Sequence, residues 1–452
     1  MNISAHRQAG TLRYTAAGLA IVIFWLLLGE FAIAMRERSA LPSVLELLRR
    51  HHASDTTVSL LVSAFPSILG LCLGPIISYR SDRYRSRWGR RLPFLMAATP
   101  VGAAAMIGLA FCPTLGAATD RWLGAWSPGL DACVLGYFCV FWAIFECIVI
   151  TTLALYAGLV NDVIPFPILG RFYGGFRVVS LSAGIVFNYW MFPLTDQYLS
   201  EVFAGIGILF GLGCMLMCVM VKEGDYPPPP EENGGGAGGL AAMGREFMRE
   251  CFSNPRYLWV FAAMMLASVT FSPFNTFYQY YANSVGISKA SLGYMSAVAY
   301  GISIVLAFGI GWLVDRYSAV RVSLAMLALH CVVSVCGYLG VRDAHSFSVL
   351  YVAHVIISGA YFTAAASMPM ALFPKMRFLQ FNSAKDVMVS LATIAIGVLQ
   401  GPVLDWSGHD YSLTLLSAAI LSLLGVACLL RVQAALALTP AGPRRALPST
   451  SA

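Results

Sequence analysis

Long apolar runs, separated by short polar segments, make up most of this chain. Each run reaches or exceeds about 20 residues, the length that an α-helix needs to cross the hydrocarbon of a membrane. The runs lack the alternation of apolar and polar positions that a membrane β-strand shows. The pattern predicts an all-α membrane protein with twelve transmembrane helices, at residues 14–34, 58–79, 92–112, 132–156, 172–193, 199–221, 256–283, 291–314, 318–341, 347–372, 381–404 and 411–432.

Composition excludes a soluble fold. Of the 452 residues, 58% are hydrophobic and 11% are charged, and the mean hydropathy is +0.72. A soluble domain does not have enough interior to bury so much apolar surface, so lipid has to solvate it. The first apolar run is full length and lacks an obvious small-residue cleavage site, so we expect it to stay as a helix.

A polar segment divides the twelve runs into two sets of six. Residues 222–251 contain four consecutive prolines followed by a glycine-rich stretch, a composition typical of a flexible linker. Six spans, a linker and six spans is the organisation of a transporter built from two parallel helix bundles. We therefore expect an N-terminal six-helix bundle at 1–221, a linker at 222–255, a C-terminal six-helix bundle at 256–433 and a tail at 434–452.

Lysine and arginine predict the orientation in the membrane. If the N-terminus is inside, most of the basic residues fall in segments on the cytoplasmic side. Both termini and the linker are then cytoplasmic, and the chain is a multi-pass protein of the plasma (inner) membrane. The net charge of +7 reflects this topology and contact with anionic lipid, so we expect no nucleic-acid partner.

One short motif occurs in both halves. The second predicted helix ends in "SYRSDRYRSRWGRRLPFL" and the eighth ends in "GIGWLVDRYSAVR", so an Asp-Arg-Tyr triplet recurs at Asp82–Tyr84 and Asp315–Tyr317. This twin motif, the span count and the linker together resemble the major facilitator superfamily. The stretch at residues 81–95 is most similar to the sucrose carrier and glycoside–pentoside–hexuronide symporter branch. Ser78 departs from the motif, which prefers glycine there, while Gly311 keeps it.

The motif residues are candidates for a gate. An aspartate at a helix end can face the positive N-terminus of a neighbouring helix, and nearby arginines can bind carboxylates through two hydrogen bonds. Such contacts would form only while the two bundles are closed on the cytoplasmic side, or the turn could simply be a solvated anchor. We expect Arg177 to pair with Asp162 or Asp386. The predicted gate residues are Asp82, Arg83, Arg90, Asp315, Arg316, Arg177 and Asp386.

Charged residues inside apolar runs are candidates for proton coupling, because a charge at membrane depth is costly and usually functional. Glu146 lies near the centre of the fourth run, and Glu30 lies deep in the first. Glu37 follows seven residues later on nearly the same helix face. Arg36 and Arg38 flank it, and we favour a first helix that continues to about Leu48 and includes them. A helix ending at Ala34 would instead leave them in the outer loop.

The resemblance bears on which ion is coupled. Sucrose carriers use a carboxylate on the fourth helix, and Glu146 lies on the corresponding helix here. Melibiose-type symporters bind sodium through aspartates on the second helix, but Val58–Tyr79 contains no acidic residue. We therefore expect a proton, carried by Glu146, with Glu37 and then Glu30 as the next candidates; a structural hydrogen bond between helices is the alternative role for Glu146.

Amides and aromatic residues in the seventh and fifth spans are candidates for binding a sugar. Aromatic faces can stack on the apolar faces of a sugar while amides bind its hydroxyls, although tyrosines near a helix end also form interfacial belts. Arg36 and Arg38 would reach the same cavity, and His330 and His354 are expected to be core residues. The predicted solute-binding residues are Arg36, Arg38, Asn188, Trp190, Asn275, Tyr278, Gln279 and Tyr281.

These features predict a secondary active transporter that carries a small polar solute, most simply a sugar or glycoside, by proton symport. The alternatives are a proton-driven efflux antiporter for a drug-like or other organic solute, and a sensor or membrane enzyme on the same helices. No nucleotide loop, zinc motif or catalytic nucleophile motif occurs, so we expect no enzyme activity, no cofactor and no metal. The expected partners are the solute, a coupling proton and membrane lipid, with the monomer as the functional unit.

Overall fold

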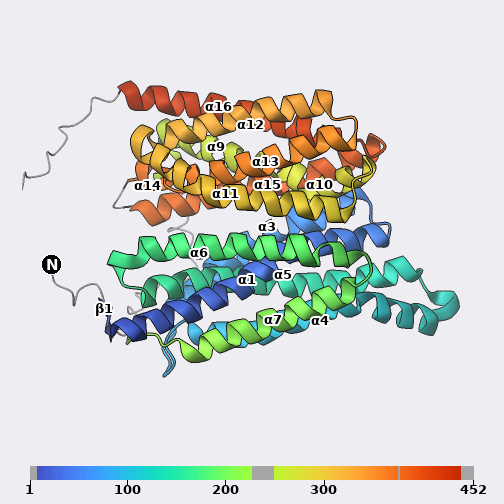
Figure 1. Cartoon of the computed structure of the whole chain (residues 1–452), viewed down its shortest axis with the longest axis horizontal. Coiled ribbons are helices and arrows are strands. Elements are labelled where there is room, and N and C mark those ends of the chain that lie inside the picture. Colours follow the sequence, from blue (N-terminus) through green and yellow to red (C-terminus); the bar gives the residue numbers. More distant parts are fainter. Residues whose placement is uncertain (1–7, 226–248, 375–376, 439–452) are drawn as a thin grey trace, which may run out of the picture.

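The computed structural model describes residues 8–225, 249–374 and 377–438. It consists of two helix bundles, one formed by the N-terminal half of the chain and one by the C-terminal half (Figure 1). The helices of both bundles run roughly along the longest axis of the molecule (Figure 1). The predicted linker lies mostly in residues 226–248, outside the described residues, as does the end of the predicted tail.

The N-terminal bundle follows a short antiparallel hairpin, in which Gln8 pairs with Arg13. Its second span is an α-helix continued through a π-helical turn, and its fifth span also ends in a π-helical turn. The elements are β1 Gln8–Ala9, β2 Leu12–Arg13, α1 Ala16–Arg50, α2 Asp55–Ser59, η2 Leu60–Ala64, α3 Phe65–Arg83, α4 Leu92–Leu123, η3 Gly124–Trp126, α5 Leu130–Val163, α6 Phe166–Val186, η4 Phe187–Met191, η5 Pro193–Asp196 and α7 Leu199–Met220.

The C-terminal bundle contains the remaining helices of the described chain. Its first span is divided into α9 and α10, with Pro273 near the start of the second part, where a proline is tolerated. The elements are α9 Pro255–Val269, α10 Ser272–Ser284, α11 Lys289–Tyr317, α12 Ala319–Gly340, α13 Ala344–Ala365, α14 Met368–Leu372, α15 Phe378–Trp406 and α16 Ser412–Leu438. The last helix therefore continues five residues beyond the bundle boundary predicted at 433, because the apolar sequence continues through Leu438.

The structure confirms the predicted all-α membrane fold. Within the described residues, eleven helical segments are long and apolar enough to cross a membrane. The remaining predicted span corresponds to α6 with η4, which carries Arg171 and Arg177. These two arginines make it more polar than the other spans.

The first helix is long, as favoured from the sequence. It begins after Thr15, whose side chain accepts a hydrogen bond from the Gly18 backbone, and it ends at Arg50. Pro42 is accommodated inside the helix. Arg36, Glu37 and Arg38 are therefore helical residues, and the alternative that leaves them in a loop is wrong.

The apolar cores show how the two bundles meet. One core is shared, since it includes α1 residues such as Leu45 together with α10 residues such as Phe277. Two other cores each belong to a single bundle, around Leu159 and around Phe261. The shared core lies toward the end where α1 ends and α11 begins, which we name the far end. The separate cores lie toward the end that carries residues 80–91, which we name the arginine end.

Close backbone contact holds the bundles together at the far end. A Cβ atom on Gly401 of α15 would lie 2.5 Å from the Cα of Thr56, and one on Gly397 would lie 2.8 Å from the backbone nitrogen of Ala64. Only glycine allows this approach, so these two positions let α15 pack directly on α2 and η2.

Candidate functional site

A cavity lies between the two bundles near the middle of the chain's helices. Its volume is about 350 Å³. Both bundles contribute polar side chains to its wall, and we name it the central cavity. The N-terminal bundle provides Glu37, Arg38, Arg177 and Asn188, and the C-terminal bundle provides Asn275, Tyr278, Tyr300, Ser303, Tyr351 and His354.

The hollow region continues from the central cavity toward the arginine end. A second cavity of about 400 Å³, the Glu146 cavity, shares Glu37 and Asn275 with the first and adds Glu146, Trp142 and Phe145. A third, of about 370 Å³, shares Ser268 and Phe362 with the second and reaches Asn382 and Lys385, near the start of α15. The molecule is thus hollow from its centre toward the arginine end and closed at the far end.

The charges around the central cavity come from the N-terminal bundle. Glu37 is exposed to both cavities. Arg38 points across to the other bundle, where its guanidinium lies 5.3 Å from the centre of the Tyr300 ring. Arg177 lines the same cavity from α6. These groups give the cavity one carboxylate and two guanidinium groups.

Arg36 lies inside the N-terminal bundle instead of in the cavity wall. It is fully buried, and its guanidinium stacks on Phe210 at 4.6 Å and lies 5.8 Å from the Phe145 ring. None of its three guanidinium nitrogens has a hydrogen-bond partner in the described part of the chain. Because a buried, unpaired guanidinium is costly, its charge needs compensation from a nearby carboxylate. Among the described residues, Glu37, Glu146 and Glu30 are carboxylates whose charge acts on Arg36.

The two buried carboxyl groups differ in their surroundings. Glu146 is 8% exposed, lines the Glu146 cavity and makes no hydrogen bond or ion pair with the described residues. Glu30 is 4% exposed and lines neither cavity. Only Glu146 and Glu37 among the three predicted proton carriers therefore have contact with the hollow region.

The C-terminal bundle offers uncharged polar groups. The rings of Tyr278 and Tyr351 are stacked, with centroids 5.6 Å apart and planes 14° apart. The Tyr351 hydroxyl shares a hydrogen bond of 2.7 Å with the Ser296 hydroxyl. Asn275 is exposed to both cavities and bonds His354 behind it. This wall combines aromatic faces with amide and hydroxyl groups, which suits a polyhydroxylated solute.

Several predicted solute-binding residues do not reach the central cavity. Trp190 is 59% exposed and contacts Tyr189, half a turn away from Asn188. Gln279 lines a separate small pocket nearer the far end, and Tyr281 packs against Phe347. The structure therefore brings together Glu37, Arg38, Arg177, Asn188, Asn275 and Tyr278, and it leaves Arg36, Trp190, Gln279 and Tyr281 outside.

At the arginine end, the described ion pairs connect helices of the same bundle. Arg90 binds Asp162 of α5 through two nitrogens, with its Nη2 at 2.8 Å from Oδ1, and Arg91 joins the same carboxylate at 3.0 Å. The Glu223 carboxylate also accepts hydrogen bonds from the backbone of Arg90 and Leu92. These contacts fix the segment between α3 and α4, which carries Arg90 and Arg91, on the N-terminal bundle.

The other predicted gate residues are dispersed. Asp315 is exposed, and Arg316 lies over the Trp312 ring. Asp386 pairs with the adjacent Lys385, and Asp162 with Arg90 and Arg91, so the expected pairing of Arg177 with either aspartate is wrong. Arg83 interacts with another residue. The Asp82 side chain lies outside the described part of the chain. The gate prediction for these residues stays a prediction.

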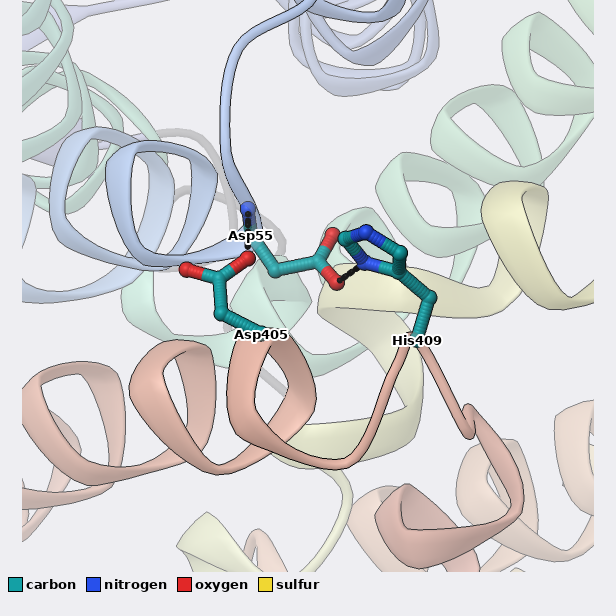
Figure 2. A group of neighbouring side chains, drawn as sticks. All are labelled: Asp55, Asp405 and His409. Atoms are coloured by element: carbon teal, nitrogen blue, oxygen red, sulfur yellow. Dashed lines mark hydrogen bonds and ion pairs between the residues drawn. The ribbon is translucent and has the colours of Figure 1, made fainter.

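The far end carries a polar contact between the bundles that the sequence did not reveal. Figure 2 shows Asp405, at the end of α15, facing the first turn of α2, with the buried Asp55 beside it. The Asp405 carboxylate accepts hydrogen bonds from the backbone N–H groups of Asp55 and Thr56, at 2.9 and 3.0 Å, and from the Thr56 hydroxyl. His409 Nδ1 lies 2.7 Å from Asp55 Oδ2 (Figure 2). We name these contacts the latch.

The latch uses the chemistry of a helix N-terminus. The first N–H groups of a helix have no partner within it, and a carboxylate there is favoured by the helix dipole. Here that carboxylate comes from the other bundle. The hydrogen bond to Asp55 raises the pKa of His409, which lies in the loop before α16. The only sequence signal for the latch was Asp405 at the end of an apolar run.

A second ionic contact lies at the far end. Lys289, at the start of α11, binds Glu46 of α1 at 2.8 Å and Asp196 of η5 at 2.7 Å. Glu46 is almost fully buried and also binds Arg49 and Arg50. Nearby, the Tyr280 hydroxyl donates to the Leu45 carbonyl at 3.1 Å. Together with the latch, these contacts close the far end.

Comparison with known proteins identifies the family. The family model for MFS/sugar transport proteins matches residues 53–396. A search of curated protein sequences finds no significant match.

Similar solved structures share the fold at low sequence identity. They include a mutant of the nucleoside transporter NupG (TM-score 0.68, 13% identity, covering 91% of this chain and 99% of that chain). The proton:xylose symporter XylE has a TM-score of 0.60 at 14% identity, covering 93% of this chain and 96% of that chain. A bacterial homologue of the human lysosomal transporter Spinster has a TM-score of 0.59 at 14% identity, covering 93% and 95%. The family model matches most of this chain, and the fold agrees with it. The chain therefore belongs to the MFS/sugar transport family of the major facilitator superfamily.

Proposed function

We propose that this protein carries a sugar or glycoside across the inner membrane together with protons, by alternating access. The central cavity carries the proposal. At about 350 Å³ it has the volume of a small-molecule site, and both bundles line it, so a bound solute would contact both. The family match to sugar transport proteins and the likeness to a proton:xylose symporter support the same solute class.

Proton coupling is proposed for Glu146 and Glu37. Glu146 faces a hollow lined by Trp142 and Phe145, where desolvation favours the neutral acid. Arg36, buried against the same Phe145, offers an unpaired positive charge that would stabilise the carboxylate after the proton leaves. Glu146 would thus exchange its proton for an ion pair with Arg36, and this exchange would link protonation to the conformational state. Glu37 faces both cavities beside Arg38 and is the second candidate, and Glu30 is the third.

The contacts at the two ends support alternating access. In the proposed orientation the far end is outside, so the latch and Lys289 hold the outer side closed. The hollow region then opens toward the cytoplasm. For the solute to enter from outside, Asp405 and His409 have to separate from α2, and the gate residues at the arginine end have to close.

Efflux of an organic cation is the alternative proposal. The Glu146 cavity favours it, because an acidic group among aromatic side chains suits a lipophilic cation. Against it, Arg38 and Arg177 make the adjoining central cavity positive, and Asn275 and Tyr278 offer hydrogen bonds that such a cation cannot use.

Reconstitution in proteoliposomes tests the proposal. We expect that one or more of sucrose, maltose and xylose accumulates above its equilibrium level when the outside is acidified, and that a protonophore collapses the gradient. Uridine tests the nucleoside class, and tetraphenylphosphonium tests the efflux class. Movement of tetraphenylphosphonium alone, driven by the same gradient, would replace sugar symport with efflux.

A further inference from the structure

A chain of buried hydrogen bonds runs from the interior of the C-terminal bundle to the central cavity. His330 of α12 and His354 of α13 are fully buried, and His330 Nε2 lies 3.1 Å from His354 Nδ1. His330 Nδ1 lies 2.9 Å from the Ser422 hydroxyl, and His354 Nε2 lies 3.0 Å from Asn275 Oδ1. The chain therefore ends on a residue exposed to the cavity.

The inner end of this chain fixes the direction of its protons. The Ala418 carbonyl can only accept, so the Thr270 hydroxyl donates to it at 2.8 Å. Thr270 has then used its proton, and Ser422, 2.7 Å away, has to donate to Thr270. The Ser422 oxygen is left to accept, so His330 has to donate from Nδ1. The reverse order would leave the Thr270 and Ala418 oxygens facing each other without a proton.

The same logic continues through the histidine pair. A neutral His330 with its proton on Nδ1 accepts at Nε2, so His354 donates from its own Nδ1. His354 Nε2 is then an acceptor and needs a donor from Asn275. An amide oxygen and nitrogen exchange positions by a half-turn of the terminal side-chain torsion, so the hydrogen-bond network decides which of the two faces His354. Here it selects the amide nitrogen, so the amide takes the half-turn from the orientation in which Oδ1 faces His354.

The surroundings favour the neutral pair over an imidazolium ion. The Phe271 ring lies 4.4 Å from His330, and the Phe274 ring lies 4.5 Å from His354. Neither histidine has a carboxylate partner among the described residues. The ionisable groups that share the central cavity with His354 are Glu37, Arg38, Arg177 and the tyrosines 278, 300 and 351. With two guanidinium groups against one carboxylate, a further positive charge there would be disfavoured.

We infer that His330 and His354 form a neutral pair with a fixed order of hydrogen-bond donors and acceptors, which we name the relay. The relay turns the Asn275 amide so that its oxygen faces the central cavity. Asn275 then presents a hydrogen-bond acceptor and recognises a hydroxyl or other donor on the solute. The inference deepens the proposed function and rests on it for the identity of the solute, whereas the relay itself requires no solute. His330 and His354 act through Asn275 and are positioning residues.

Nitrogen-15 NMR of the histidine side chains tests the relay in the full-length protein, labelled at its seven histidines and held in lipid nanodiscs at neutral pH. Loss of one signal in His330→Gln and another in His354→Gln assigns the pair. His345→Gln, an exposed position on α13, is the matched control and should leave both signals unchanged. We expect both histidines to carry their proton on Nδ1 and none on Nε2. A proton on Nε2 of either residue would overturn the relay.

Ser422→Ala gives a second reading that does not remove a histidine. Without the Ser422 acceptor, His330 should lose its preference for Nδ1 and show a mixture of the two tautomers, and an unchanged His330 would refute the proposed direction.

For the solute, Asn275→Asp keeps an acceptor and should keep the rise in thermal stability given by whichever of sucrose, maltose and xylose stabilises the protein. Asn275→Leu should lose it. Because the NMR result requires no solute, a failed relay and a failed transport proposal are distinguishable.

Discussion

The centre and the far end of this molecule are both contacts between the same two bundles, yet they are built differently. At the centre, Glu37, Arg38 and Asn275 line open space and leave hydrogen-bonding capacity unused. At the far end, Asp405 reaches directly from one bundle to the backbone of the other, and glycines bring the backbones together. The centre is therefore suited to hold a third molecule, and the far end is suited to hold a conformation.

This difference separates two kinds of substitution. A change at the centre should alter solute binding or coupling while the population of closed and open states stays the same. A change at the far end should alter that population by the free energy of the lost contact, without changing the intrinsic affinity of the cavity. The predictions below use this separation.

The largest effect is expected at Glu146. Glu146→Gln resembles the protonated acid permanently, so proton-driven accumulation of solute should be abolished, while binding and downhill exchange remain. Uptake into acidified proteoliposomes, compared with counterflow under no gradient, measures the two activities. Glu201→Gln, an exposed position at the start of α7, is the control and should accumulate normally. Accumulation that survives in Glu146→Gln would move the proton site to Glu37.

The next effect is expected at Asp405. Asp405→Asn removes the charge from hydrogen bonds to two backbone N–H groups and one hydroxyl, and charge-assisted bonds of this kind contribute about 1.5–3 kcal/mol each. We expect the ratio of closed to open far end to fall tenfold or more. A cysteine at Ser63, placed in a background without the eleven native cysteines, should react correspondingly faster with an impermeant thiol reagent from outside.

Asp410→Asn is the matched control for this measurement. Asp410 lies in the same loop as His409 but caps Ser412 of its own bundle, so its replacement should leave the reactivity of the cysteine unchanged. Equal rates for the two variants would remove Asp405 from the latch.

A smaller effect distinguishes two amides of the same helix. Asn275 faces the central cavity and Gln279, one turn further toward the far end, lines a separate pocket with Lys289. Asn275→Ala should weaken sugar binding by up to about tenfold, the value of one ordinary hydrogen bond, and Gln279→Ala should leave it within about twofold. Isothermal titration calorimetry with a stabilising sugar gives the dissociation constant of each variant. A loss of binding in Gln279→Ala alone would favour the interpretation reached from sequence.

The sequence predicted the scaffold well, because membrane helices are encoded by long apolar runs. The twelve spans, the two sets of six and the extended first helix all followed from local composition. Within the site, Glu37, Arg38, Asn188 and Asn275 could be selected because polar residues in apolar runs are costly. All four line the central cavity, and their roles there stay predictions.

The remaining features depend on depth and on contacts distant in sequence. Gln279 lies on the same face of α10 as Asn275, but one turn, about 5.4 Å, closer to the closed far end. Trp190 follows Asn188 by half a turn and faces outward. The latch joins Asp55 to residues some 350 positions away, and no local pattern indicates such a pairing. The histidine relay likewise needed four helices, α10, α12, α13 and α16, to be placed together.

The smallest expected effect is a pH dependence of the latch. His409 binds the Asp55 carboxylate, with Asp405 and Tyr411 as its other ionisable neighbours, and this hydrogen bond raises the pKa of His409 in the closed state. Below about pH 6.5, the ordinary histidine value, the imidazole is charged in both the open and the closed state, so its contribution to closure is fully present. That contribution is lost as the pH rises through the raised pKa of the closed state. Because the His409 side chain is 59% exposed, solvent screens the pair, and closure should weaken by no more than about fivefold.

The rate of labelling at Ser63→Cys should therefore rise from acid to alkaline pH, after correction for the reactivity of a free thiol, and His409→Gln should remove the rise. His51→Gln is the control, since His51 pairs with Asp131 inside one bundle at the same end and its loss should leave the rise intact. A profile that stays the same in His409→Gln would show that another group titrates, and it would reduce the latch to the contacts of Asp405.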